Sequence, residues 1–153
     1  MKKLLSIFAV VAAIFAVSCG GDAATPSETV VKFYELVATG EYEAAVEHLS
    51  FHATSPEEVE QGKAMIVSLQ SEKAAPMLEK KGGLKSIEAI SETISEDGKS
   101  AKVEVKITYG NGTEEKQAGD LILDESGNWK LKLNKKSIKM LLKRGLTKHL
   151  VNP

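Results

Sequence analysis

The spacing of apolar and polar residues divides this chain into a helical N-terminal half and a C-terminal half made of strands. Between about residues 25 and 81, apolar side chains recur every three or four positions, the period of a helix with one buried face. From residue 84 onward the period becomes two, and over 101–109 apolar side chains alternate with lysine, glutamate and threonine. Helices followed by strands in this order predict an α+β domain.

Three helices are predicted in the first half. Residues 25–28 read Thr-Pro-Ser-Glu, in which the threonine caps the helix, the proline suits its first turn and the glutamate reaches back to the cap. This helix ends at Gly40, and a second runs over about 41–49. A third begins with the same type of signal and covers 55–73. Pro76 then interrupts it, because proline removes a helical hydrogen bond.

The second half predicts four strands in hairpin succession. Their expected ranges are 84–95, 101–109, 114–124 and 128–133. A turn dipeptide lies between each pair of consecutive strands: Asp97-Gly98, Asn111-Gly112 and Ser126-Gly127. Four consecutive hairpin strands form an antiparallel meander, and the N-terminal helices are the available cover for its apolar face.

A basic amphipathic helix is predicted over 135–153. Six lysine and arginine residues between Lys135 and Lys148 surround an apolar stripe that includes Ile138 and Leu141. The stripe is expected to pack on the domain and leave a solvated basic face. In the alternative interpretation, the basic face lies on anionic lipid headgroups.

The first nineteen residues predict export. A basic start precedes the apolar run 4–17, which is shorter than the roughly 20 residues that a membrane-spanning helix needs. Residues 16–19 resemble the lipobox of bacterial lipoproteins, although Ala16 stands where leucine is commonest. We therefore expect cleavage between Ser18 and Cys19 and lipidation of Cys19. The alternative is an ordinary secretory signal that leaves Cys19, the chain's single cysteine, as a chance thiol.

These features divide the chain into four parts: a signal peptide (1–18), a lipidated tether (19–24), an α+β domain (25–134) and the basic helix (135–153). Several acyl chains on Cys19, palmitate among them, suffice for stable attachment to a bilayer. Gly20 follows the cysteine in place of the aspartate that retains many Gram-negative lipoproteins in the inner membrane. The expected location is thus the cell envelope, at the outer membrane rather than the inner one.

Composition argues against two classes of partner. Loss of Lys2 and Lys3 with the signal peptide changes the formal net charge from −1 to −3, which disfavours nucleic-acid binding. Aromatic residues make up only 5% of the chain, with one tryptophan, so few side chains are available to stack on sugars. The 135 residues that remain after residue 18 are enough for one domain with its own core.

The domain resembles small Gram-negative lipoproteins of the nuclear-transport-factor-two-like (NTF2-like, or cystatin-like) superfamily, whose domain is of unknown function. The similarity lies in the segments 30–34 (VVKFY), 40–45 (GEYEAA), 101–105 (AKVEV), 109–113 (YGNGT) and 127–131 (GNWKL). It implies a curved antiparallel sheet wrapped on a long helix, a cone with one open end. Some superfamily members are enzymes, such as ketosteroid isomerase and scytalone dehydratase, whereas many only bind ligands or proteins.

Tyr34 and Tyr109 are the candidate cavity residues, because their hydroxyl groups can project into such a cone. The pattern pairs neither with an inward acid, so no catalytic residue is assigned and no enzyme is expected. His48 and His52 are four residues apart but lack a third ligand, so no metal site and no cofactor are expected.

The sequence therefore predicts a membrane-anchored envelope lipoprotein without enzymatic activity. It would bind a small ligand or a partner protein through its cone or its sheet face. One alternative is an isomerase- or dehydratase-like enzyme that uses a polar group in the cone. Another is a membrane-associated accessory subunit that works through the basic tail.

Replacing Cys19 with serine tests the anchor. Because the acyl acceptor is the cysteine sulfur, Cys19→Ser protein should accumulate as an uncleaved, unacylated precursor. Fractionation and intact-mass measurement would detect it. Processing and membrane attachment like those of the wild type would contradict the lipoprotein assignment.

Overall fold

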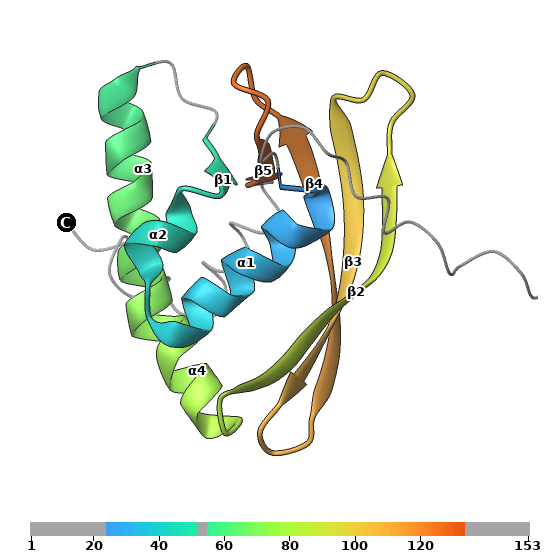
Figure 1. Ribbon diagram of the computed structural model, residues 1–153. Helices are drawn as coiled ribbons and strands as arrows, with labels where there is room; N and C mark the ends of the chain where they lie inside the picture. Colours follow the sequence, from blue (N-terminus) through green and yellow to red (C-terminus); the bar gives the residue numbers. More distant parts are fainter. Residues whose placement is uncertain (1–23, 52–54, 134–153) are drawn as a thin grey trace, which may run out of the picture.

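The computed structural model describes residues 24–51 and 55–133, which form two layers (Figure 1). Helices cover one face of a curved sheet, and the longest strands lie side by side behind α1. The predicted signal peptide, Ser18, Cys19, His52 and the predicted helix over 135–153 lie outside the described residues. Within the described ranges, no helix is both long and apolar enough to cross a bilayer.

The helices and strands follow the predicted order, with differences at two places. The helices are α1 (Pro26–Thr39), α2 (Tyr42–Val46), α3 (Pro56–Leu69), the π-helix η1 (Gln70–Ala74) and α4 (Ala75–Lys80). The strands are β1 (Leu49–Ser50), β2 (Leu84–Ile94), β3 (Ser100–Tyr109), β4 (Glu114–Leu123) and β5 (Trp129–Lys132). In the sheet they stand in the order β1-β5-β4-β3-β2.

The sheet has five strands and is mixed, so the prediction of a four-stranded antiparallel meander was incomplete. The pairs β2–β3, β3–β4 and β4–β5 are antiparallel as expected. The additional strand β1 pairs in parallel with β5, with Leu49 opposite Leu131. The predicted second helix stops at Val46 rather than Leu49. The backbone of residues 49–50 instead pairs with β5, a strand whose residues lie 82 positions further along the sequence.

Local signals define α1 at both ends. The Thr25 hydroxyl accepts a hydrogen bond from the Glu28 N–H at 3.2 Å, and the Glu28 carboxylate accepts one from the Thr25 N–H at 2.8 Å. Gly40 ends the helix in the left-handed region at a φ of 82°, which favours glycine. The Ser27 N–H also donates to the Glu92 carboxylate of β2 at 2.9 Å, so the positive end of α1 is held against the edge strand.

Pro76 does not interrupt the third helical segment as predicted. The chain passes from α3 into the π-helix η1 and then into α4, where Pro76 occupies the first turn. The wider turn is visible in the bond from the Ala75 N–H to the Gln70 carbonyl, five residues back. Pro76 has no N–H to donate, and the wider π-turn directly before it accommodates the missing hydrogen bond within the continuous helical run.

The core lies between the helices and the inward face of the sheet. On β3 the inward residues are those that the alternation predicted, and all five are at most 7% exposed: Ala101, Val103, Val105, Ile107 and Tyr109. Val30 of α1 and Leu121 of β4 are 1% and 0% exposed and belong to the same cluster. Burial of this apolar surface is the main favourable term in folding.

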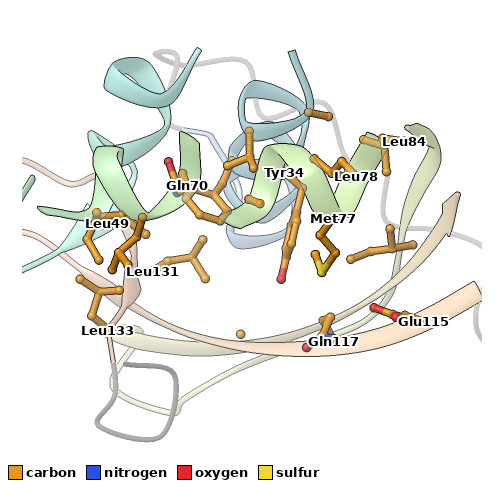
Figure 2. Close-up of a pocket in the computed structure, with 18 of the residues that line it drawn as sticks. Tyr34, Leu49, Gln70, Met77, Leu78, Leu84, Glu115, Gln117, Leu131 and Leu133 are labelled. Atoms are coloured by element: carbon orange, nitrogen blue, oxygen red, sulfur yellow. The ribbon is translucent and has the colours of Figure 1, made fainter. Parts of the chain in front are cut away.

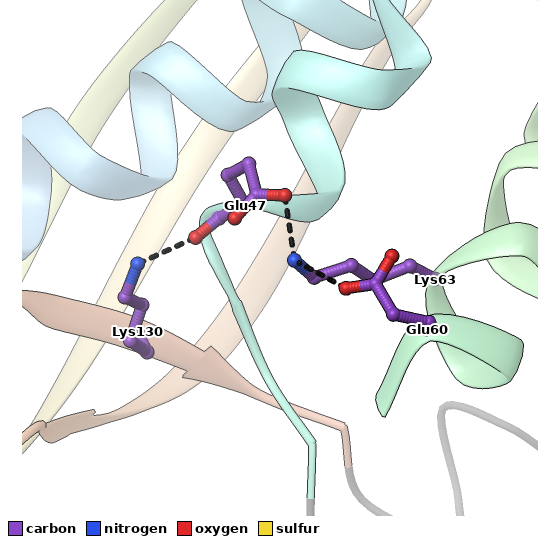
Figure 3. A network of polar contacts seen from close by, with 4 residues as sticks. All are labelled: Glu47, Glu60, Lys63 and Lys130. Atoms are coloured by element: carbon purple, nitrogen blue, oxygen red, sulfur yellow. Dashed lines mark hydrogen bonds and ion pairs between the residues drawn. The ribbon is translucent and has the colours of Figure 1, made fainter. Parts of the chain in front are cut away.

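A network of polar contacts holds the start of β1 against its neighbours (Figure 3). The Glu47 carboxylate accepts from Lys63 of α3 at 2.7 Å, and the Glu47 carbonyl accepts from Lys130 of β5 at 2.6 Å. Lys63 also pairs with Glu60 at 3.4 Å. The hydrogen bond from Lys63 lowers the pKa of Glu47. Exposed pairs of this kind contribute little stability, so we assign the network to positioning rather than to stability.

Truncation of Leu121 should test the core. Leu121→Ala removes a side chain that is 0% exposed and leaves a cavity, so the free energy of unfolding should fall by about 2–5 kcal/mol. Leu123→Ala, in the same strand but only half-buried, is the matched control and should cost less. Chemical denaturation measures both. Equal losses would contradict this placement of the core.

Candidate functional site

A cavity of about 310 Å³ lies between the helices and the concave face of the sheet (Figure 2). Its walls come from α1, from the run of α3, η1 and α4, and from the inward faces of β3 and β4. This volume is at the lower end of the range of small-molecule sites. The cavity is formed by the described residues themselves and needs no second chain to complete it.

The inward face of β4 forms part of the cavity wall. The inward positions of this strand are those opposite the buried residues of β3: Gly119 faces Val103, and Gln117 faces Val105. Leu121 fills the core, and the Leu131 side chain packs directly on Gly119, where a Cβ would lie 2.8 Å from it. Beyond Gly119 the strand presents Gln117 and Glu115 to the cavity. The inward face therefore changes from apolar to polar over about 14 Å of strand.

A polar cluster lies at the Glu115 end. The Tyr109 hydroxyl donates to the Glu115 carboxylate at 3.0 Å. Lys81, between α4 and β2, forms an ion pair with the same carboxylate. The Lys81 ammonium also lies 4.1 Å from the centroid of the Tyr109 ring, within the range of a cation–π contact. The side chains of Lys81 and Glu115 are 22% and 36% exposed, so the cluster lies near the mouth of the cavity.

Tyr34 crosses the cavity from the helical side. Figure 2 shows its ring projecting from α1, with the hydroxyl directed toward the sheet. Burial, and then the nearby Tyr109 and Glu115, raise the pKa of Tyr34 to about 12, so its hydroxyl is uncharged at neutral pH. Among the residues that the structure describes, nothing forms a hydrogen bond with this hydroxyl. It can therefore donate to or accept from a bound molecule.

The opposite end of the cavity is apolar, apart from one amide. The apolar lining there consists of Leu49, Ile66, Leu69, Leu131 and Leu133. Gln70 also belongs to the lining and is 7% exposed, and its Oε1 has no hydrogen-bond partner within the described ranges. Gln70 is the first residue of the π-helix, a type of turn that often occurs at functional sites. An unpaired buried acceptor is costly, so a ligand or water that donates to it would stabilise the fold.

No group of three or more histidine, cysteine, aspartate or glutamate residues that could hold a metal occurs in the described part of the chain. His48 follows α2, where burial, and then the charges of Lys130 and Lys32, lower its pKa. His52, its predicted neighbour, lies outside the described residues. Among the residues described, those that line the cavity include no serine, threonine, cysteine or histidine.

The structure brings both sequence-predicted cavity residues, Tyr34 and Tyr109, into the lining of the same cavity. Sequence reasoning missed Glu115, Lys81 and Gln70. Glu115 could have been found from the sequence. It lies six positions before Leu121 in the same strand, and because side chains alternate between the two faces, both point inward. Lys81 precedes the strands and Gln70 lies in a helix with a local π-turn, so no period in the sequence pointed to either.

The comparisons with known proteins agree with this architecture. The family described as Domain of unknown function (DUF4878) matches residues 17–132. A crystal structure of a protein from Campylobacter jejuni, named as a candidate NTF2-like transpeptidase, superposes with a TM-score of 0.63 at 21% identity. The match covers 72% of this chain and 100% of that one, so the fold is NTF2-like.

A weaker similarity exists to the intermembrane space region of the chloroplast protein ARC6. Its TM-score is 0.40 at 17% identity, and the match covers 69% of this chain and 88% of that one. No curated protein matches the sequence.

High pH should test the environment of Tyr34. Its pKa of about 12 exceeds the value near 10 of an unfolded chain, so its contribution to stability is complete below pH 10 and is lost as pH rises toward 12. The free energy of unfolding should therefore fall by up to about 2 kcal/mol more in the wild type than in Tyr34→Phe across this interval. Denaturant unfolding at a series of pH values measures the difference.

Tyr42→Phe is the matched control for this pH experiment, because Tyr42 lies outside the cavity lining. This variant keeps the Tyr34 phenol and should retain the wild-type pH dependence. An ultraviolet titration should also show that the tyrosinate that forms near pH 12 in the wild type is absent in Tyr34→Phe. The same titration curve in both variants would contradict the raised pKa.

Proposed function

We propose, from the premise that the chain belongs to the DUF4878 family of domains of unknown function, that this protein binds a small, mostly apolar ligand without transforming it. The observation that carries the proposal is the preformed cavity of about 310 Å³, with an apolar interior and a polar cluster at one end. Sites of this composition are typical of small-molecule binding, where few polar groups orient a ligand held mainly by apolar contacts.

The chemistry of the cluster favours binding over catalysis. Glu115 already accepts a hydrogen bond from Tyr109 and pairs with Lys81, so its oxygens are occupied. A pKa of about 12 leaves Tyr34 far from the neutral range in which a general acid or base works best. In this arrangement the groups are better suited to orienting a ligand than to moving its protons.

An isomerase- or dehydratase-like activity is the second candidate. The observation that favours it is an inward carboxylate 3.0 Å from one tyrosine hydroxyl, with a second tyrosine in the same lining. Catalysis would require a substrate to displace Lys81 or Tyr109 from Glu115. The transpeptidase activity in the name of the structural neighbour is not proposed, because that chemistry needs a nucleophile and the described part of the lining offers no serine, threonine or cysteine.

The predicted anchor completes the proposal. Acylation at Cys19 would place the start of α1, at Pro26, seven residues from the lipid attachment. The cavity would then work close to the envelope membrane, where sparingly soluble molecules are concentrated. We therefore place this protein in the cell envelope, at the outer membrane, as a lipid-anchored binding domain.

Co-purification from the native envelope tests binding. The full-length protein would be isolated in detergent, and the small molecules extracted from it would be identified by mass spectrometry. We expect one compound at about one molecule per chain. In Gln117→Phe it should fall at least about fivefold, because a ring at this inward position occupies the cavity.

Lys116→Phe is the matched control, since Lys116 is the exposed, outward neighbour of Gln117 in β4. It should keep the compound, and circular dichroism should show both variants folded. Absence of any enriched compound from the wild type, or equal amounts in the two variants, would overturn the proposed function.

A further inference from the structure

The charged residues at the mouth of the cavity indicate which charge a ligand can have. Lys81 lies beside the polar end, and Glu115 neutralises it directly through their ion pair. Apart from Glu115, the charged residues of the lining that the structure describes are Asp120 and Lys132, and both are exposed. An anionic ligand at the polar end would therefore meet a carboxylate rather than a free ammonium group.

The polar atoms left open to a ligand are uncharged. The Tyr34 hydroxyl is neutral and has no hydrogen-bond partner in the described chain, and the same holds for the buried Gln70 Oε1. Gln70 Oε1 can only accept, and Tyr34 can donate or accept. The Gln70 amide also carries an N–H donor at Nε2, so the amide does not discriminate by charge, and an uncharged hydroxyl group can satisfy either site.

The two ends of the cavity also differ in polarity along one direction. On the sheet side, Glu115 stands at one end, with Tyr109 hydrogen-bonded to it, and Leu49, Leu131 and Leu133 stand at the other (Figure 2). Tyr34 reaches between them from the helical side. A ligand with a polar group at one end and an apolar body would match this gradient, with its polar group beside Tyr34.

We infer, on the basis of the proposed function, that the ligand is an uncharged amphiphile with a hydroxyl-type head, and that Glu115 excludes anionic analogues. Glu115 is here a specificity-determining residue: its charge cancels that of Lys81 and repels a second carboxylate. Two like charges about 4 Å apart in a partly desolvated site disfavour binding strongly. Removing the Glu115 charge should leave Lys81 uncompensated and convert the site into one that accepts anions.

Three water-soluble probes of equal chain length test the inference: 1-hexanol, hexanoate and hexylamine. The full chain, reconstituted in lipid nanodiscs, would carry tyrosine labelled with carbon-13 at Cζ. Its three tyrosines give three signals, and Tyr34→Phe identifies that of Tyr34. We expect 1-hexanol to shift the Tyr34 signal saturably, with an affinity at least about tenfold higher than that of hexanoate or hexylamine.

Glu115→Gln should abolish the preference for 1-hexanol over hexanoate. The amide keeps the size of the side chain and can still accept from Tyr109, so the expected change is specific: hexanoate gains at least about tenfold relative to 1-hexanol. Glu114→Gln is the matched control, because Glu114 is the exposed neighbour in β4. It should keep the wild-type order of affinities.

The outcomes separate the two proposals. Preferential binding of hexanoate or hexylamine to the wild type, or an unchanged preference in Glu115→Gln, overturns the inference and leaves the proposed function standing. If none of the three probes moves the Tyr34 signal, the cavity does not bind small amphiphiles, and the proposed function is overturned with the inference.

Discussion

The structure depends on burial of the inward face of β3 beneath α1. Every second residue of β3 is apolar and points to the helical side, and Val103 and Val105 are fully buried there. Because the side chains of a strand alternate between two faces, this row determines which residues of the paired strands also point inward. The position of β4, and with it the cavity, follows from that register.

The cavity is the region where the same register meets a different sequence. Beside Val103 and Val105, β4 contributes Gly119, on which the Leu131 side chain packs, and Gln117, so the inward row becomes polar where it lines the cavity. Polar groups that face inward need partners. Glu115 obtains them from Tyr109 and from Lys81, and that pairing determines the charge that a ligand would meet.

Elements defined by neighbouring residues were predictable. The capping residues of α1, the alternation of β3 and the hairpin turns act over a few positions, and the structure contains each of them. The two wrong predictions concern longer-range or unusual geometry. Residues 49–50 form a strand because β5 offers a partner, and Pro76 is accommodated because the helix widens in η1 before it.

The sequence by itself determined the α+β class, the order of helices and strands, and two of the residues that line the cavity, Tyr34 and Tyr109. The class and the order follow from periodicity and capping, which are local, and the two tyrosines were candidates because the chain resembles NTF2-like proteins. Only the tertiary structure decided the fifth strand and the meeting of Lys81, Tyr109 and Glu115. The fifth strand pairs with a partner 82 positions away, and the contacts of Lys81, Tyr109 and Glu115 join residues up to 34 positions apart, so both depend on how the sheet curves and where the helices cross it.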